Sequence, residues 1–508
     1  MSMQALNTQA LIAVIGAGAM GAGIAQVAAQ AGHQVRLFDM RDGAAGEAIA
    51  NIDRQLGKRV ANGKLDAQDR ADIVARLRPA DSIEALADSH LVIEAIVENL
   101  EVKRGLFTQL ETLCSADCIL ASNTSSLSIT ALAAGMQHPQ RVVGMHFFNP
   151  APVMALVEVV SGLATAPGIA QCVHSTAAAW GKKPVHTRST PGFIVNRVAR
   201  PFYAESLRAL QEGAASSATL DALMREAGAF RMGAFELTDL IGHDVNYAVT
   251  CSVFNAYYND MRFQPSLVQK ELVDAGHLGR KSGQGFYSYA ADAAKPAADE
   301  LSAASQVVES CVLEGSLGAA QGLIGRIKAA GVKVIERDGS GVLRVGDAVV
   351  ALSDGRMACQ RSLQDGHRNL VLLDLAKDYS KATRIGLACA QNTSREALDQ
   401  VVSLLARCSI KSSLLADIPG LAVMRTVAML ANEAADAALH NVGTPTDIDL
   451  AMCAGVNYPM GPLAWADEIG LPAVLQTLDN LQRAYGEERY RPSLLLRRKV
   501  AEGSRFHD

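Results

Sequence analysis

The sequence has no excess of basic residues, since 47 lysines and arginines stand against 52 aspartates and glutamates, a formal net charge of -5 over 508 residues. With no surplus to neutralise phosphates, a nucleic-acid carrier is disfavoured. The nine cysteines are scattered without metal-site spacing, so no metal is expected. Cys114 and Cys118 beside an apolar run are expected to be reduced core thiols, which favours a cytoplasmic setting.

Long apolar runs are also scarce, and one segment alone resembles a membrane helix. Residues 11–31 carry no charge, but no basic residues precede them. Glycine, alanine and glutamine stand there in place of the bulky apolar side chains that a membrane span needs. We therefore expect a soluble protein without a membrane partner. The length and an apolar fraction of 49% together predict about three or four folded domains.

Up to about Thr190 the sequence alternates short apolar runs with helical stretches, which predicts a doubly wound parallel sheet. From Pro191 to about Asp274 only helical periodicity remains. The segment 290–300, rich in alanine, aspartate and proline, is typical of an interdomain linker. The runs expected to form strands are residues 11–15, 34–38, 91–96, 118–122 and 142–146.

The second half of the sequence repeats part of the first half, and the matched positions are separated by one constant number of residues, which we call the repeat offset. Asp239, for example, matches Asp467. Several matches at this repeat offset indicate a duplicated helical domain. Between the copies, the segment 311–409 again looks α/β but lacks the glycine triplet of the first strand and turn, so we expect a degenerate copy that no longer binds nucleotide. The other matches are residues 190–196 with 418–424, Met232-Gly233 with Met460-Gly461, Gly242 with Gly470 and, one residue out of step, 265–267 with 492–494.

A glycine-rich turn at residues 16–21 follows the first expected strand and opens a helix. The first glycine permits a tight turn, the second lets the backbone approach a pyrophosphate, and the third allows close packing of helix and strand. Asp39, ending the next strand, is placed to bind an adenine ribose and to repel a 2′-phosphate, which favours NAD over NADP, although Arg41 weakens that preference. The cofactor residues expected in the turn are Gly16, Gly18, Ala19, Met20 and Gly21.

Oxidation of an alcohol by NAD needs a base that takes the hydroxyl proton. His146 ends an expected strand, where open α/β sheets bind ligands, although a histidine there is more often structural. Its surroundings favour the base, because residues 143–150 (VGMHFFNP) resemble the L-3-hydroxyacyl-CoA dehydrogenase family. The resemblance spans about residues 9–290, and the second half resembles the extra domains of long bacterial members that act on 3-hydroxyadipyl-CoA in phenylacetate catabolism. The other matching segments are residues 96–103, 122–127, 156–159 and 190–197.

The resemblance implies NAD-dependent oxidation of the 3-hydroxyl of an (S)-3-hydroxyacyl-CoA, as in β-oxidation of fatty acids. His146 would be the general base, and Glu158, costly in an apolar strand without a partner, would hold its imidazole in one tautomer. Ser125 and Asn196 would hydrogen-bond the substrate oxygen, unless they are only a turn hydroxyl and a helix-start residue. The residues implied to line the nicotinamide ribose side are Glu98, Lys103 and Asn123.

CoA carries phosphates, so a local basic patch is expected despite the acidic total. Arg54 and Lys58 share one face of the helical stretch where the family binds CoA, although a solvated basic face would look the same. Arg231 stands in the run FRMGA, where many members have YPMGP. We hypothesise that it binds the distal carboxylate of a dicarboxylic acyl group, the alternative being a surface arginine that caps a loop.

The second copy departs from the pattern at Met424, which corresponds to Asn196 and forms no strong hydrogen bond. We therefore expect one active site per chain. The second helical copy should pack against the first and imitate the dimer contact of shorter members, so the protein is expected to be either a homodimer or a monomer. The expected domains, α/β and all-α in turn, are a Rossmann-type domain (1–189), a helical domain (190–290), a degenerate Rossmann-like domain (300–410) and a second helical domain (411–508).

Two other functions fit parts of the pattern. A short-chain 3-hydroxybutyryl-CoA dehydrogenase using NAD or NADP would have the same site chemistry. A nucleotide-sensing protein built on a retired dehydrogenase would keep the glycine-rich turn alone, whereas Ser125, His146, Glu158 and Asn196 all occur together here.

Overall fold

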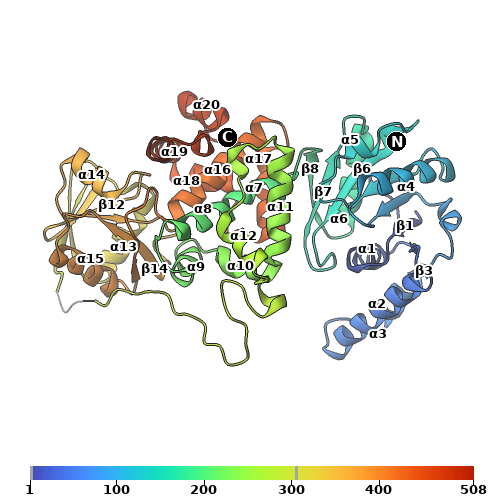
Figure 1. The fold of residues 1–508 in the computed structure, drawn as a ribbon, viewed down its shortest axis with the longest axis horizontal. Coiled ribbons are helices and arrows are strands. Elements are labelled where there is room, and N and C mark those ends of the chain that lie inside the picture. The colour runs from blue at the N-terminus through green and yellow to red at the C-terminus, as the bar shows by residue number, and fades with distance from the viewer. Residues whose placement is uncertain (1–3, 304–306) are drawn as a thin grey trace. The chain divides into compact units, whose positions relative to one another are not determined.

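The structure, a computed structural model, describes residues 4–303 and 307–508. The chain divides into two compact units, Met1–Arg197 with His440–Val456, and Val198–Leu439 with Asn457–Asp508. Each unit is built on one β-sheet (Figure 1). Within the described ranges no helix is both long and apolar enough to cross a membrane. The uncharged stretch at residues 11–31 instead forms β1 (Ile12–Ile15) and α1 (Ala19–Gln30).

The sheet of the first unit has the order β3-β2-β1-β4-β5-β6-β7-β8. Strands β1 to β6 run parallel, as predicted, in the order of a dinucleotide-binding fold. β7 runs antiparallel to β6, and β8 is parallel to β7, a reversal that the prediction of a parallel sheet did not contain. The further strands are β2 (Val35–Phe38), β3 (Leu77–Pro79), β4 (Leu91–Glu94), β5 (Ile119–Ser122), β6 (Val142–Phe147), β7 (Leu156–Ser161) and β8 (Lys183–Arg188).

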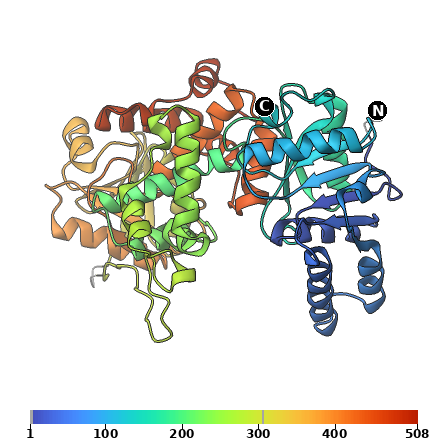
Figure 2. The same cartoon turned by 45° about the vertical axis from the view of Figure 1, so that its right-hand side comes forward.

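Helices cover both faces of this sheet because alternate residues of each buried strand point to opposite sides. Ile12 and Val14 pack with Ile24 of α1, whereas Ala13 and Ile15 pack in a second core with Phe107 of α4. Figure 2 shows α2 and α3 as a pair of helices that projects from this region. The helices of the unit that precede β8 are α2 (Ala44–Ala61), α3 (Ala67–Arg76), α4 (Leu100–Leu113), α5 (Ile129–Leu132) and α6 (Pro167–Ala179).

The predicted duplication of the helical domain is confirmed by the helix boundaries. α10 (Ala234–Ile241) and α18 (Pro462–Ile469) begin and end at the repeat offset. The other pairs, counted from the first copy to the second, are α8 (Arg200–Gln211) with α16 (Val423–Leu439), α9 (Ser217–Glu226) with α17 (Pro445–Val456), α11 (His243–Ala256) with α19 (Leu471–Tyr485), and α12 (Leu267–Asp274) with α20 (Leu494–Glu502); the short α7 (Val195–Val198) precedes α8.

The sheet of the second unit is mixed, with the order β10-β9-β11-β12-β13-β14-β15, and α13 to α15 lie around it (Figure 1). The repeat offset continues here, since it relates β14 (Arg384–Cys389) and α15 (Arg395–Arg407) to β7 and α6. The region therefore is α/β, as predicted. Its other elements are β9 (Ser310–Glu314), α13 (Gly322–Ala329), β10 (Lys333–Arg337), β11 (Val342–Val345), β12 (Ala348–Leu352), α14 (Ala358–Asp365), β13 (Leu370–Leu373) and β15 (Lys411–Leu414).

Each helical copy supplies one helix to the sheet of the other copy. α17 of the second copy packs on β7 and β8, and α9 of the first copy packs on β14. Within the second unit α16 lies against α8, where Arg425 Nε donates to Glu205 Oε2 at 2.6 Å in a fully buried pair. The prediction that the second helical copy packs against the first is therefore confirmed.

Candidate active site

His146 and Glu158 face each other across the antiparallel pair β6 and β7, where they are register partners. Their side chains meet with His146 Nδ1 2.7 Å from Glu158 Oε2. Both residues are buried, at 6% and 1% exposure, and the rings of Phe148 and Phe193 lie 4.5 and 5.9 Å from the imidazole, centroid to centroid. The reversal of β7 thus creates the predicted pair, because residues directly opposite in an antiparallel ladder have neighbouring side chains.

The second carboxylate oxygen of Glu158 holds the start of α7. Oε1 accepts the backbone N–H groups of Ile194 and Val195, each at 3.0 Å. Asn196 is the next residue and is half-buried. One buried carboxylate therefore positions both the imidazole and the segment that carries Asn196.

Ser125 lies in the loop after β5 and is tied to Glu98. Glu98 Oε1 accepts the N–H of Ser125 at 3.0 Å and the hydroxyl of Thr124 at 2.6 Å, and Oε2 lies 3.2 Å from Lys103 Nζ. Burial opposes the ionised form of Glu98, but the bonds from Thr124 and Lys103 lower its pKa below the ordinary value. The structure therefore brings Glu98, Lys103 and Ser125 together in one charged network.

Glu94, a residue that the sequence reasoning did not select, anchors this network. Its Oε1 lies 2.6 Å from Lys103 Nζ and its Oε2 accepts the Ser122 hydroxyl at 2.6 Å, and both Glu94 and Lys103 are buried. A carboxylate within an apolar strand is costly unless it is paired, and this cost was the signal that could have identified it. Asn123 follows Ser122, and its Oδ1 accepts the N–H of Phe147, the neighbour of His146, at 2.8 Å.

The glycine-rich turn has the shape that a pyrophosphate needs. Gly16 has a φ of 103°, and a Cβ at Gly21 would lie 1.7 Å from the Gly16 carbonyl oxygen, so both positions require glycine. A Cβ at Gly18 would meet no described atom within 4 Å. Gly18 also caps α1 without a side-chain hydrogen bond, which leaves the N–H groups at the helix start available to an anion.

Asp39 lies at the end of β2 beside this turn. Its Oδ2 accepts the N–H of Ala17 at 2.8 Å, and its Oδ1 accepts Nε of Arg41 at 3.1 Å. Burial opposes ionisation, yet the N–H groups of Ala17 and Arg41 and the Arg41 guanidinium lower the pKa of Asp39. An ionised acceptor at this position fits the ribose hydroxyls of NAD, so the donor and acceptor set fits the expected cofactor.

A pocket of about 850 Å³ lies beside the turn and is bordered by α2. Its lining includes Gly18 and, from α2, Asn51, Gln55 and Arg59. Arg54 and Lys58 are exposed on α2 but do not line this pocket, and Arg54 Nη2 donates to Asn51 Oδ1. Arg59 is therefore a candidate for a phosphate contact that the helical-face argument missed.

Arg231 belongs to the second unit, where it is exposed in the bend that precedes α10.

The second copy lacks the pair of His146 and Glu158. At the repeat offset Asp374 replaces the histidine and Gly386 replaces the glutamate. Asp374 Oδ2 accepts the N–H groups of Ala422 and Val423 at 3.0 and 2.8 Å, which are the equivalents of Ile194 and Val195. Asp374 therefore still binds the peptide groups at the start of the helix, as Glu158 does in the first copy, but the second copy has no imidazole.

Comparisons with known proteins agree with this geometry. Residues 11–190 match the family of the 3-hydroxyacyl-CoA dehydrogenase NAD binding domain, residues 192–289 and 420–505 both match the C-terminal domain of the same enzymes, and residues 350–419 match the 3-hydroxybutyryl-CoA dehydrogenase reduced Rossmann-fold domain.

The similar proteins include full-length and half-length relatives. The 3-hydroxyadipyl-CoA dehydrogenase of Escherichia coli K12 is 46% identical over 97% of this chain and 98% of its own length. The 3-hydroxybutyryl-CoA dehydrogenase of Clostridioides difficile is 40% identical over 55% of this chain and 99% of its own length. A crystal structure described as 3-hydroxybutyryl-CoA dehydrogenase from Escherichia coli K12 superimposes with a TM-score of 0.89 at 45% identity, covering 98% of this chain and 99% of that one. The chain therefore belongs to the 3-hydroxyacyl-CoA dehydrogenase family, whose members are NAD-dependent oxidoreductases.

Proposed function

We propose that this enzyme oxidises the 3-hydroxyl of (S)-3-hydroxyadipyl-CoA in the cytoplasm, with His146 as the general base. The contact that carries the proposal is the 2.7 Å pair of His146 Nδ1 and Glu158 Oε2. It keeps the proton on Nδ1 and leaves Nε2 to accept the hydroxyl proton of the substrate. The glycine-rich turn and Asp39 would hold NAD, which would supply the hydride acceptor.

The protein groups around the base then have separate tasks. Glu158 stabilises the imidazolium that forms when His146 takes the proton, because it places a buried negative charge against the ring. Ser125 and Asn196 hold the substrate oxygen by hydrogen bonds and so orient the carbinol carbon. Glu98 and Asn123 line the nicotinamide ribose side, and Lys103 holds Glu98 there from the buried side. Arg59, with Arg54 and Lys58 on the same helix, attracts the phosphates of CoA.

The dicarboxylic substrate is supported by the name of the full-length relative and by the charge of Arg231 in an otherwise apolar run. The second candidate is 3-hydroxybutyryl-CoA, because a full-length solved structure and half-length relatives carry that name. The two acyl groups differ in a terminal carboxylate, and a cation that pairs with it would discriminate between them.

The test is a comparison of 3-hydroxyadipyl-CoA and 3-hydroxybutyryl-CoA by NADH absorbance, with NAD and with NADP. We expect kcat/KM with NAD to be at least about tenfold higher for the dicarboxylic substrate, which corresponds to about 1.4 kcal/mol. The Arg231→Ala variant should lose this preference while its rate with the butyryl substrate stays unchanged. Equal losses with both substrates would contradict the role of Arg231, and silence with every acyl-CoA would contradict the reaction.

We further propose one working site per chain and a monomeric enzyme. The pair of Asp374 and Gly386 has neither an imidazole nor a carboxylate partner for one, and α17 already covers the edge formed by β7 and β8. The second copy thus covers these strands with a helix of the same chain, and the duplication takes the place of a second subunit.

A further inference from the structure

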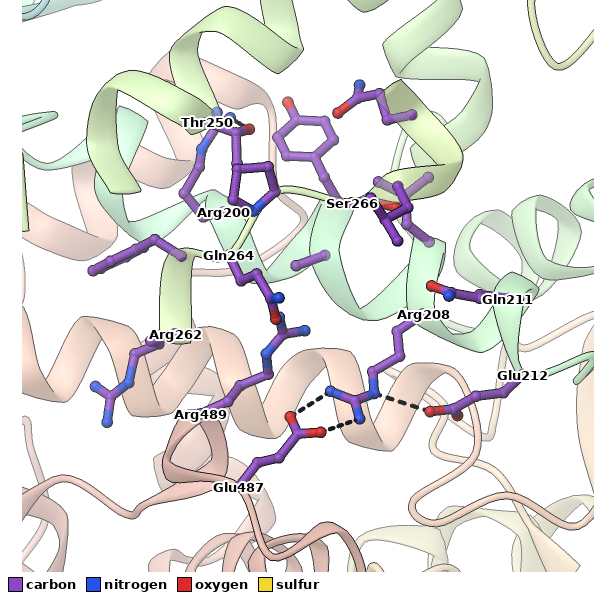
Figure 3. Close-up of a pocket in the computed structure, with 17 residues that line it drawn as sticks. Arg200, Arg208, Gln211, Glu212, Thr250, Arg262, Gln264, Ser266, Glu487 and Arg489 are labelled. Atoms are coloured by element: carbon purple, nitrogen blue, oxygen red, sulfur yellow. Dashed lines mark hydrogen bonds and ion pairs between the residues drawn. The ribbon is translucent and has the colours of Figure 1, made fainter. Parts of the chain in front are cut away.

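The second unit contains a cavity of about 460 Å³ whose lining includes α8, the segment at residues 264–267 that leads into α12, and the segment around residues 487–489 near the C-terminus (Figure 3). In this view Arg489 and Arg208 extend toward the middle of the cavity. The charged side chains of its lining are four arginines and two glutamates: Arg200, Arg208, Arg262, Arg489, Glu212 and Glu487.

Two of these arginines, Arg262 and Arg489, occupy equivalent positions in the two copies of the repeat. Arg262 lies in the 3-10 helix Met261–Phe263 and Arg489 in the 3-10 helix Glu488–Tyr490, and each is followed, after two further residues, by a Pro-Ser-Leu sequence. The two 3-10 helices contact each other. The surroundings of the two arginines can therefore be compared position by position.

The surroundings of Arg262 are filled and neutralised. Its Nη1 pairs with Glu433 Oε2 at 3.3 Å and with Asp436 Oδ2, both on α16. Beside them Asn432 Oδ1 accepts the N–H of Ser493 at 2.7 Å, and Asn432 Nδ2 donates to the carbonyl of Arg491 at 3.0 Å. Two carboxylates and one amide thus surround Arg262, and we call this region the filled half of the repeat.

The surroundings of Arg489 lack two of these three groups. The equivalents on α8 are Glu205 for Glu433, Arg208 for Asp436 and Ala204 for Asn432. A carboxylate is replaced by a guanidinium and an amide by a methyl group, so this half gains positive charge and empty space.

Arg489 is consequently buried with a longer ion pair than those of Arg262. It is 5% exposed, and its Nη1 lies 4.0 Å from Glu205 Oε1, while Glu205 Oε2 is bound to Arg425 at 2.6 Å. A further contact is a 3.4 Å bond from Nη2 to Gln264 Oε1. Ser266, the equivalent of Ser493, has a buried hydroxyl with no hydrogen-bond partner in the described part of the chain.

The charges along α8 and α16 add to the difference between the surroundings of Arg489 and those of Arg262. Arg200, Ala204 and Arg208 form a stripe along one face of the helix, with two positive charges, whereas the equivalent α16 stripe of Ala428, Asn432 and Asp436 has one negative charge. Arg208 is itself held by Glu487 and Glu212, at 2.6 and 2.9 Å. Arg200 donates to Thr250 Oγ1 at 3.0 Å, and burial lowers the pKa of its guanidinium.

We propose that this cavity binds a small molecule through a carboxylate or phosphate group, which takes the place that the Asp436 carboxylate has in the other half. Arg489 and the Ser266 hydroxyl supply the donors, since a guanidinium pairs with a planar or tetrahedral oxyanion through two parallel N–H bonds. The volume suits a small metabolite. All lining residues belong to the second unit, so the site is separate from the glycine-rich turn and from His146.

Calorimetric titration of the NAD-saturated enzyme with inorganic phosphate and, separately, with succinate tests the proposal, since saturation occupies the anion site of the glycine-rich turn. We expect one binding event per chain for at least one probe. Arg489→Gln should weaken it at least tenfold, whereas Arg395→Gln, at an exposed arginine of the same unit, should not. The probe that binds more tightly shows whether the site prefers a phosphate or a carboxylate group.

Ala204→Asn is the second variant, because it restores the amide of the filled half without removing a charge. It should occupy the cavity, accept the backbone N–H of Ser266 as Asn432 accepts that of Ser493, and weaken anion binding at least tenfold while raising the Tm. Absence of binding of both probes at millimolar concentration, or binding that neither Arg489→Gln nor Ala204→Asn weakens, would overturn the site.

Discussion

Glu158 divides its two carboxylate oxygens between the His146 ring and the peptide groups that begin α7. An amide at this position keeps one oxygen for those peptide groups but loses the negative charge against the imidazole. Removal of the charge and removal of the whole side chain should therefore have different consequences, and this difference separates positioning from catalysis.

We predict that Glu158→Gln lowers kcat by about 10²- to 10⁴-fold with little change in the Tm, because the imidazolium loses its counter-charge. Glu158→Ala should in addition lower the free energy of unfolding by about 1–3 kcal/mol for each N–H left without an acceptor. Steady-state kinetics and thermal unfolding of both variants measure the two effects. A Gln variant with wild-type kcat would show that the carboxylate only supports the fold.

Asp374, at the position of His146 in the second copy, allows a prediction on pH. The residue is fully buried, and burial raises its pKa to about 6 although peptide N–H groups oppose this shift. In the unfolded chain the pKa is about 3.9. Between these values the folded state holds a proton that the unfolded state has released, so the stability contributed by Asp374 falls as pH rises through about 4 to 6.

The change should amount to about 3 kcal/mol at most, from about two pKa units at 1.36 kcal/mol each. Urea unfolding of the wild type and of Asp374→Asn, which does not titrate, isolates it. The stability of the wild type relative to the variant should decline from pH 4 to pH 6 and level off above pH 7. A difference that is constant over this range would show that the folded-state pKa is not raised.

At the scale of elements, the turn between β1 and α1 separates glycines that the fold needs from one that the ligand needs. Gly21 packs against Gly16, where a Cβ would clash with backbone, whereas a Cβ at Gly18 meets nothing. The sequence pattern treated these glycines as one motif, and the structure assigns them different roles.

We predict that Gly18→Ala leaves the Tm of the enzyme without NAD unchanged but weakens NAD binding at least tenfold, because the methyl group occupies the approach of the pyrophosphate. Gly21→Ala should lower the Tm itself. Gly46→Ala on α2, where a Cβ also meets nothing within 4 Å, is the matched control and should be neutral or slightly stabilising. Thermal unfolding and calorimetry with NAD decide between these outcomes, and normal NAD affinity of Gly18→Ala would contradict the assignment.

At the scale of the whole molecule, the duplication places a helix of each copy on the sheet of the other. Gly455 of α17 shows how close the contact is, since a Cβ there would lie 2.5 Å from Leu156 Cδ2 on β7. A chain that covers this edge with its own helix has no need of a second subunit to bury it.

We predict a monomer, with a mass near 53.6 kDa by light scattering coupled to size exclusion. A mass twice as large, unchanged on dilution, would contradict the replacement of the dimer contact.

We also predict one NAD per chain by calorimetry, because the second α/β region lacks the glycine triplet. A stoichiometry of two would show that the second copy still binds nucleotide.

Much of the fold follows from sequence because its signals are local. The strand Val142–Phe147 and the repeated helices have periodic patterns that need no knowledge of distant contacts. The reversal of β7 and β8 was not foreseen, because an apolar strand reads the same in either direction. Glu94 was missed because its partner Lys103 lies on the following helix, and their spacing in the sequence does not indicate that the two side chains meet.

The sequence by itself determined the glycine-rich turn, Asp39 at the end of β2 and the duplication, since each depends on backbone geometry or on residue identity at fixed spacing. Only the tertiary structure decided that Glu158 binds both His146 and the start of α7, that α17 covers the first sheet, and that Arg262 pairs with Asp436 on α16. These features depend on strand register and on contacts between residues that are distant along the chain, which local periodicity does not encode.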